Sequence, residues 1–297
     1  MKILVTGREG QLARGLVEAA GAGLEVVAIG RPEIDLTDLR SAGAAIARER
    51  PDLVVNTAAY TAVDKAESEP AVAMAVNASG AEHVARACAA GAIPLIHLST
   101  DYVFDGNKKE PYREDDAVGP INAYGRGKLE GELRVERACA QHLILRTAWV
   151  HSPWGNNFVK TMLRLAAERP QIGVVDDQWG SPTYAPHLAD IVLALARKIK
   201  ADAAGIPWGT YHAVNAGEAT RCGLAREVFH CAREQGLPAA DVAPIGVADY
   251  PTPARRPANS MLDCTALRRS FGLELPDWRV GVRDCIARLA AARPGAA

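Results

Sequence analysis

The sequence has almost no net charge, few aromatic residues and no long apolar run. Its 297 residues include 34 Lys and Arg against 35 Asp and Glu, which gives a formal net charge of -1. A near-neutral chain lacks the basic surface that nucleic-acid binding generally requires, so we expect no nucleic-acid partner. No uncharged apolar stretch reaches the roughly 18 residues of a membrane-spanning helix, and we expect no membrane partner. Aromatic residues make up only 5%, so small and branched aliphatic side chains must fill the core.

Cysteine is also scarce and scattered. The 6 cysteines are widely spaced and form no C-x-x-C pair, so the sequence predicts neither a metal site nor a disulfide framework. Residues 1–7 contain only a short apolar stretch, whereas a signal peptide needs a longer one. We therefore expect a cytoplasmic protein whose cysteines are free thiols.

Short β-rich runs alternate with longer helical stretches in the first half of the chain. Strands are predicted at 3–6, 25–29, 53–56, 93–99 and 143–147, with helices at 11–20, 38–50 and 71–90. Apolar strands separated by helices are typical of a parallel sheet covered on both faces. The sequence therefore predicts an α/β fold with a Rossmann-type doubly wound parallel sheet, which binds ligands at the carboxyl ends of its strands.

The pattern becomes less regular after Trp149. Helices are predicted at 157–168, 187–200 and 220–235, with short strands at 172–175 and 211–215. We predict a dinucleotide-binding domain over residues 1–150. Residues 151–297 are predicted to form mainly a smaller substrate-binding lobe, from which some segments return to the first domain.

A glycine-rich turn follows the first predicted strand. Gly7, Gly10 and Ala13 form the pattern G-x-x-G-x-x-A, and Gln11 and Leu12 open the helix behind it. Glycines at such a turn allow backbone N–H groups to approach a pyrophosphate at the helix N-terminus. The pattern alone would also suit any tight turn, but its place between a strand and a helix favours dinucleotide binding.

The ends of the next two strands are candidates for further cofactor contacts. Arg31 follows the second strand, where a cation favours the 2′-phosphate of NADP(H) and an acid favours NAD(H). Arg31 is either that phosphate ligand or a solvated loop residue, and the cofactor is NADPH or NADH. Asp35 and Leu36 come soon after and could flank the adenine. After the third strand, small residues next to Tyr60 could lie against the cofactor, namely Ala58 and Ala59.

Three further residues suit carbonyl reduction. Tyr124 and Lys128 have the i,i+4 spacing that places both on one face of a helix, and Thr100 lies at a strand end. A nearby ammonium lowers the pKa of a phenol, which is otherwise about 10. A hydroxyl can hold the substrate oxygen beside the phenol. Each feature alone also occurs as a surface helix pair or a strand-end hydroxyl, but their order along the chain favours catalysis.

Over nearly its full length the chain resembles the dTDP-4-dehydrorhamnose reductase family, within the extended short-chain dehydrogenase/reductases. The resemblance rests on long motifs in order, namely Gly7-x-x-Gly10-Gln11-Leu12, AAYTAVDKAE at 58–67, STDYVFDG at 99–106, Tyr124-Gly125-x-x-Lys128, RTAWV at 146–150, NFV at 157–159, DDQxGSPT at 176–183 and RPxxSxLD at 256–263. His151 departs from the pattern, because relatives usually have Tyr there.

The resemblance implies NAD(P)H-dependent reduction of the 4-keto group of dTDP-4-dehydro-L-rhamnose to dTDP-L-rhamnose, a precursor of surface polysaccharide. It implies Thr100, Tyr124 and Lys128 as the catalytic residues, with Tyr124 as the proton donor. Cofactor contacts are implied for Gly10, Gln11, Leu12, Asp35, Leu36, Ala59, Tyr60, Thr61, Tyr124 and Lys128, and sugar-nucleotide contacts for Thr100, Asp101 and Trp149. Some relatives hold Mg²⁺ at a dimer contact built from glutamates, and no residue of this sequence can be matched to that site. A homodimer is a further expectation.

Two other functions share this fold. A 4,6-dehydratase or epimerase is one, but a dehydratase places adjacent Asp and Glu after the Thr, and here Tyr102 follows Asp101. The other is a non-catalytic dinucleotide-binding partner, like the regulatory subunit of methionine adenosyltransferase. Intact Thr100, Tyr124 and Lys128 favour chemistry over that role.

The second half offers two more substrate candidates. Arg256, in a basic loop, either clamps the diphosphate of the sugar nucleotide or remains solvated. Trp149 either stacks on the sugar or fills the core where the two regions meet.

Overall fold

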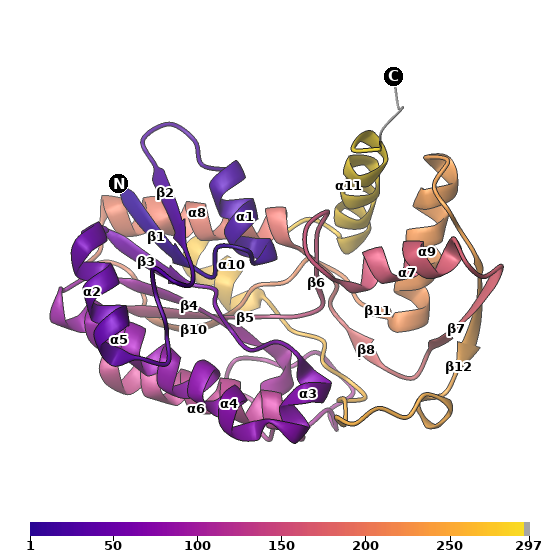
Figure 1. Ribbon diagram of the computed structural model, residues 1–297, viewed down its shortest axis with the longest axis horizontal. Coiled ribbons are helices and arrows are strands. Elements are labelled where there is room, and N and C mark those ends of the chain that lie inside the picture. The colour runs from indigo at the N-terminus through magenta and orange to yellow at the C-terminus, as the bar shows by residue number, and fades with distance from the viewer. Residues whose placement is uncertain (294–297) are drawn as a thin grey trace.

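The computed structural model describes residues 1–293, which form an α/β fold around one six-stranded parallel sheet (Figure 1). This confirms the predicted fold class. The strand order is β10-β5-β4-β3-β1-β2, and the strands are β1 (Lys2–Thr6), β2 (Glu25–Ile29), β3 (Leu53–Asn56), β4 (Leu95–Thr100), β5 (His142–Thr147) and β10 (Gly209–His212). The chain passes from β1 to β2 on one side and then to β3 on the other. The switch point, where such sheets bind ligands, therefore lies between β1 and β3.

The sixth strand, β10, comes from the second half of the chain. The sequence predicts a strand at 211–215, but the structure begins it two residues earlier, at Gly209, and ends it at His212. It pairs in parallel with β5, with Tyr211 opposite Leu145. A segment of this length carries little periodicity, so neither its bounds nor its sheet could be read from the sequence.

Helices cover both faces of the sheet. On one face lie α1 (Gln11–Glu18), α8 (Ala185–Ala201) and α10 (Thr265–Phe271), and on the other α2 (Leu39–Glu49), α5 (Gly80–Ala90) and α6 (Ala123–Ala138) (Figure 1). The residues of β1 pack alternately against these two groups of helices. Ile3 and Val5 point into the core that includes α1 and α8, whereas Leu4 packs into the core with α2 and α5. Successive strand residues face opposite sides, so an all-apolar strand serves both cores.

The helix predicted at 71–90 is not one regular helix. It consists of α4 (Pro70–Met74), a π-helical segment η1 (Ala75–Ser79) and α5. A π turn accommodates an additional residue within a helix, and such turns are frequent at functional sites. Alanine-rich composition predicts helix here but does not distinguish the two kinds of turn.

A second core lies beside the sheet. It is built by α7 (Phe158–Ala166), α9 (Arg221–Glu234) and α11 (Trp278–Ala291), together with the parallel strands β7 (Gln171–Val175) and β12 (Asp241–Ile245). We call this region the lobe. The short elements are α3 (Val63–Ser68), η2 (Asp101–Val103), β6 (Val150–His151), β8 (Trp179–Gly180), β9 (Thr183–Tyr184), β11 (Ala219–Thr220) and η3 (Val247–Asp249). The predicted domain division stays a prediction, and its last residues, 294–297, lie outside the described part.

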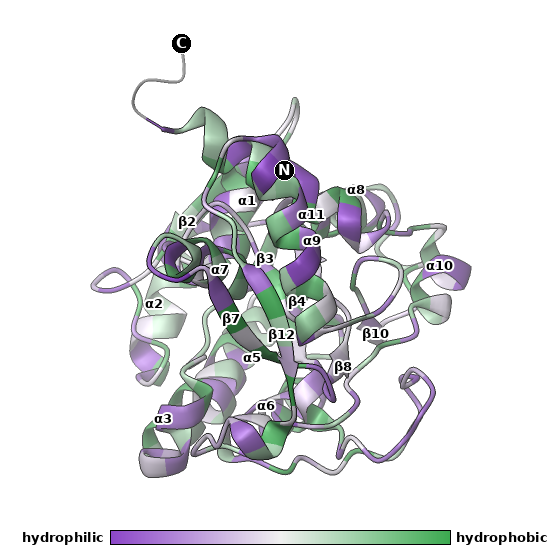
Figure 2. Ribbon diagram, turned by 90° about the vertical axis from the view of Figure 1, so that its right-hand side faces the viewer, coloured by the Kyte–Doolittle hydropathy of each residue, from purple (hydrophilic) through white to green (hydrophobic). Residues whose placement is uncertain are grey.

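Hydrophilic residues gather on the periphery, for example on α3 and at one end of α10 (Figure 2). Among residues 1–293, no helix combines the length and apolar character needed to cross a bilayer. All 6 cysteines are free, and five of them are buried.

Candidate active site

A cavity of about 710 Å³ opens at the carboxyl edge of the sheet, around the switch point. This size is within the usual range for a cofactor site. Its lining includes ten of the residues expected at the cofactor, namely Gly7, Gly10, Gln11, Leu12, Arg31, Ala58, Ala59, Thr61, Tyr124 and Lys128. Further lining comes from Arg8, Ser99, Thr147, Val150 and Leu188, among others. The structure therefore brings most of the expected residues to one place.

The glycine turn brings backbone amides to this cavity. Gly7 has φ +85°, and a Cβ added there would lie 3.0 Å from Cα of Ala58 at the end of β3. Only glycine allows the two turns to approach so closely. Gly10 caps α1 without a side-chain hydrogen bond. The first N–H groups of the helix thus have no partner within the helix and are suited to bind an anionic phosphate.

Two arginines stand at the end of β2. Arg31 lines the cavity and donates to Asp35 across 3.2 Å, although its side chain is 69% exposed. Arg8, which the sequence analysis did not single out, also lines the cavity, and it binds both carboxylate oxygens of Glu33 at 2.9 Å. No motif pointed to Arg8, because it occupies a variable position inside the glycine turn.

Three of the expected cofactor residues lie outside the cavity lining. Leu36 is buried in the core beside α2 and α5. Asp35 accepts from the backbone and the hydroxyl of Thr37. Tyr60 donates from its hydroxyl to Glu69 at 2.8 Å. These contacts give each residue a structural role, and their contact with the cofactor stays a prediction.

Helix α6 carries Tyr124 and Lys128 one turn apart, and glycines bring it close to its neighbours. A Cβ at Gly125 would collide with the carbonyl oxygen of Tyr102, and one at Gly131 with that of Asn77 in η1. Asn122 caps the helix by accepting from the N–H of Gly125 at 2.8 Å. The fit of α6 against η1 and the turn after β4 therefore fixes where both side chains enter the cavity.

Burial dominates the electrostatics of this pair. It raises the pKa of Tyr124, and the negative charge of Asp101 acts in the same direction, whereas a hydrogen bond with Thr100 opposes them. Burial lowers the pKa of Lys128 to about 8, against the influence of Glu132. Lys128 is 2% exposed and donates to the carbonyl oxygen of Leu98 at 2.6 Å. The lysine is therefore close to changing its charge in the neutral range.

Thr100 and Asp101 lie where β4 ends, next to Tyr124. Thr100 donates to a carboxylate oxygen of Asp101 at 2.9 Å and accepts from the N–H of Tyr102 at 3.2 Å. Burial raises the pKa of Asp101 to about 6. The Tyr102 ring meets the Tyr124 ring edge-on at a centroid distance of 5.8 Å. Thr100 therefore lies next to Tyr124, and Lys128 follows one turn further along α6.

On the lobe side lies Arg221, which no sequence motif indicated. The guanidinium of Arg221, at the start of α9, lies over the Trp149 ring, 3.5 Å from its centroid. Burial lowers the pKa of Arg221, whereas the negative charge of Asp101 favours its ionised form. Trp149 borders two cores and packs directly against Gly180, so it fills the junction between sheet and lobe.

Arg256 is already paired within the chain. It binds both carboxylate oxygens of Asp64, at 3.1 and 2.8 Å, and donates to the Thr252 hydroxyl at 2.6 Å. A diphosphate would have to share or replace the Asp64 contact. Its role as a clamp therefore stays a prediction.

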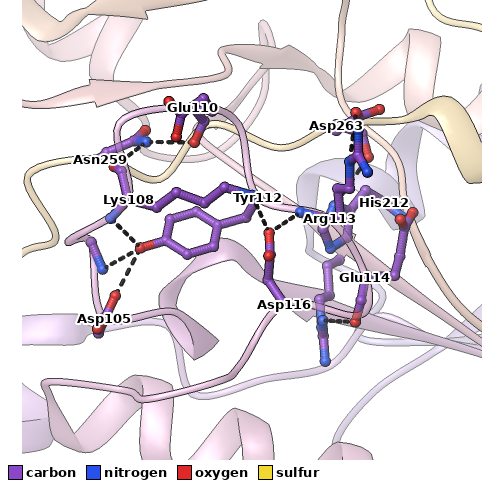
Figure 3. A network of polar contacts seen from close by, with 12 residues as sticks. Asp105, Lys108, Glu110, Tyr112, Arg113, Glu114, Asp116, His212, Asn259 and Asp263 are labelled. Carbon is purple, nitrogen blue, oxygen red and sulfur yellow. Dashed lines mark hydrogen bonds and ion pairs between the residues drawn. The ribbon is translucent and has the colours of Figure 1, made fainter.

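A polar network fastens the loop after η2 to the segment that follows Arg256 (Figure 3). The Tyr112 hydroxyl donates to Asp105 at 2.8 Å and accepts from the N–H of Lys108 at 3.1 Å. The Asn259 amide donates to the carbonyl oxygens of Lys108 and Glu110, at 2.8 and 3.0 Å. Two motifs far apart in sequence are thereby joined, which holds Asp101 and Arg256 on neighbouring segments.

His151 is buried. Burial lowers the pKa of His151 to about 4, and its ring packs 5.7 Å from that of Tyr184, so it is a neutral packing residue. Within residues 1–293, no group of three or more His, Cys, Asp or Glu side chains could hold a metal ion. No residue is assigned to magnesium.

These features define a class, the reductases with a Rossmann-type fold, and one solved relative of this class is in complex with NADP. Residues 1–291 match the RmlD substrate binding domain family. The chain belongs to this family, whose curated members here are named dTDP-4-dehydrorhamnose reductase.

The relatives match along nearly their whole length. The reductase of Sinorhizobium fredii is 47% identical over 286 residues, 96% of this chain and 97% of its own. The Escherichia coli K12 reductase is 42% identical, over 97% and 98% of the two chains. A Bacillus anthracis reductase solved in complex with NADP has a TM-score of 0.90 at 34% identity, covering 97% of this chain and 99% of its own. The sequence resemblance is thereby confirmed.

Proposed function

We propose that the protein is an NAD(P)H-dependent oxidoreductase that reduces the 4-keto group of dTDP-4-dehydro-L-rhamnose to dTDP-L-rhamnose. The observation that carries this function is the placement of Tyr124 and Lys128 in the lining of the switch-point cavity, with Thr100 next to the phenol. The curated relatives carry the name of this activity.

Different residues of the chain bind the cofactor, position the substrate and donate the proton. The Gly7–Gly10 turn and the start of α1 hold the diphosphate of the cofactor, and Lys128 lines the same cavity. When bound, NAD(P)H supplies the hydride. Thr100 positions the keto oxygen, and Tyr124 gives its proton to that oxygen as negative charge develops there. Because burial holds the Tyr124 phenol protonated, it is a proton donor at neutral pH.

The site favours simple reduction over dehydration. A dehydratase must also move protons at neighbouring carbons, which requires a second carboxylate beside Asp101. That position is Tyr102, whose ring packs against Tyr124. Elimination therefore lacks its base.

A substrate-dependent assay separates catalysis from a regulatory role. The purified protein is mixed with NADPH, and absorbance is followed with and without dTDP-4-dehydro-L-rhamnose. Oxidation only when the keto sugar is present supports the reductase. Tight NADPH binding without oxidation would favour the dinucleotide-binding partner.

We also propose that the lobe binds the sugar nucleotide. Arg221 is the stronger candidate for its diphosphate, since it stacks on Trp149 beside Asp101, and Arg256 is the second. The free cysteines suit a reducing cytoplasm, where we place the enzyme. The homodimer stays a prediction, which light scattering on the full chain checks.

A further inference from the structure

A chain of buried polar side chains runs beneath the cavity and ends at Lys128. Thr6, Asn56 and His97 are each at most 1% exposed. The strand register places them side by side, with Thr6 opposite Asn56 and Asn56 opposite His97. The Thr6 hydroxyl donates to Oδ1 of Asn56 at 2.6 Å, and Nδ2 of Asn56 lies 3.0 Å from Nδ1 of His97. Nε2 of His97 lies 3.5 Å from Nζ of Lys128.

The direction of these hydrogen bonds fixes the tautomer of His97. The Thr6 hydroxyl accepts from the N–H of Ala58 at 3.3 Å and donates to Oδ1 of Asn56 at 2.6 Å. The Asn56 amide must then donate to Nδ1 of His97, which is therefore unprotonated. A neutral imidazole carries one N–H, and here that N–H is on Nε2, facing Lys128.

The imidazolium form does not fit this site. Its Nδ1–H would face the N–H of Asn56, which is also a donor. Burial lowers the pKa of His97 well below its usual value, and the charges of Lys128 and His142 act in the same direction. His97 is therefore a fixed donor toward the lysine.

We propose that His97 is a positioning residue of the proposed reduction, whose Nε2–H stabilises the neutral amine that Lys128 becomes after it has passed a proton to Tyr124. The proton balance is complete. Tyr124 gives its proton to the substrate oxygen, Lys128 replaces it, and a solvent proton restores the ammonium. An ammonium has no lone pair for the Nε2–H, whereas the amine accepts it.

Charged and titratable groups from α6, β5 and the end of β4 also surround Lys128. On its own helix, Glu132 favours the ammonium, but Glu132 is itself bound by Arg146 of β5 at 2.7 Å. Tyr124 on the same helix stays neutral, and Asp101 follows β4. Burial opposes the ammonium, and His97 is the side chain of β4 that lies nearest to it, with Nε2 at 3.5 Å from Nζ.

The tautomer can be measured without substrate. Histidine labelled with ¹⁵N in the full chain gives separate NMR signals for the two ring nitrogens. We expect His97 to be protonated on Nε2 and bare on Nδ1 in the wild type. In Asn56→Asp, the carboxylate accepts from the ring, so the proton should move to Nδ1. A wild-type His97 protonated on Nδ1 would overturn the proposal, whatever the enzyme reduces.

The catalytic consequence is tested by the pH dependence of kcat/KM with NADPH and the keto sugar. Reduction needs the Lys128 ammonium, so activity falls as pH rises through its pKa. Without the Nε2–H donor the amine is less stable, and the alkaline limb should move up by about one pH unit in Asn56→Asp. His97→Phe should move it in the same direction without adding a charge.

The exposed His230 on α9 provides the control, and His230→Phe should leave the limb in place. If His97→Phe does not fold, His97→Leu takes its place as the uncharged variant, because the carboxylate of Asn56→Asp alone would also raise the pKa of Lys128. An unmoved limb in the folded variants refutes the role of His97. A wild type with no turnover refutes the reductase function, while the NMR result still stands alone.

Discussion

The sheet edge and the lobe hold charge in different ways. At the sheet edge, Lys128 is buried and fixed by a backbone carbonyl and by His97, and the glycine turn offers backbone N–H groups. On the lobe side, Arg221 stacks on an aromatic ring and Arg256 pairs with Asp64, whose side chain is 41% exposed. Tyr102 lies between the two regions, against Tyr124.

This difference teaches where chemistry and recognition reside. Groups fixed by strand register and helix packing can be placed accurately enough for proton transfer. Arginines on flexible stems can exchange one anion for another, which suits substrate binding. We therefore expect changes at the sheet edge to affect turnover or folding, and changes on the lobe to affect KM.

The largest effect should come from Tyr124→Phe. Loss of the proton donor should lower kcat by about 10²- to 10⁴-fold, the usual contribution of general acid catalysis. NADPH binding, measured by fluorescence titration, should be nearly unchanged. The exposed Tyr250 is the matched control, and Tyr250→Phe should keep full activity. A fully active Tyr124→Phe would falsify the assignment.

The next effect concerns the buried pair beneath Lys128. Arg146→Met leaves Glu132, which is 1% exposed, without its partner, and should lower the free energy of unfolding by about 3–5 kcal/mol. Urea denaturation checks this value. Arg86→Met removes an exposed pair with Glu82 and should cost far less. Equal losses in the two variants would contradict the distinction between buried and exposed charge.

On the lobe, Arg221→Ala should raise KM for the sugar nucleotide by about 10- to 100-fold, the range for a lost hydrogen bond to a charged group. The kcat should change much less, since Arg221 does not touch the reacting atoms. Steady-state kinetics at saturating NADPH separate the two constants. Arg226→Ala, on the outer side of α9, is the control. A fall in kcat alone would move Arg221 from recognition to catalysis.

The smallest effect is expected at Arg31, whose side chain is 69% exposed. Arg31→Ala should lower the ratio of NADPH to NADH efficiency by roughly 2- to 5-fold, as for an exposed ion pair. Parallel kcat/KM measurements with both cofactors give this ratio, and Arg40→Ala serves as control. An unchanged ratio would rule out the contact with the 2′-phosphate.

Much of the sheet could be predicted because its strands are largely apolar and the first strand leads into a glycine turn. The glycine turn and the pair Tyr124 and Lys128 were found from spacing, and both line the cavity. The spacing of residues in a sequence shows which of them are neighbours within one helix or one turn. The glycine turn is one such element, and Tyr124 and Lys128 lie on one helix.

The rest depends on contacts between distant segments. His97 is one polar residue in an apolar strand, and only the register with β3 shows that Asn56 lies beside it. Arg221 begins a helix far from Trp149 in the sequence, so no local pattern links them. The pairing of Arg256 with Asp64 spans 192 positions. Such contacts follow from the packed fold and are not encoded in any short motif.

The π-helical segment η1 also affects how the helix that contains it responds to a change in length. The carbonyl oxygen of Asn77, in η1, lies against Gly131 of α6. Later residues of the same helix, including Val84 and Cys88, pack into the core beside the sheet. Removing one residue from 75–79 would restore regular winding and leave α5 facing the sheet much as before, because the π turn absorbs the extra residue. A deletion within α5 itself would instead rotate the residues after it by about 100°. We therefore expect the stretch 75–79 to tolerate the loss of one residue far better than α5 does.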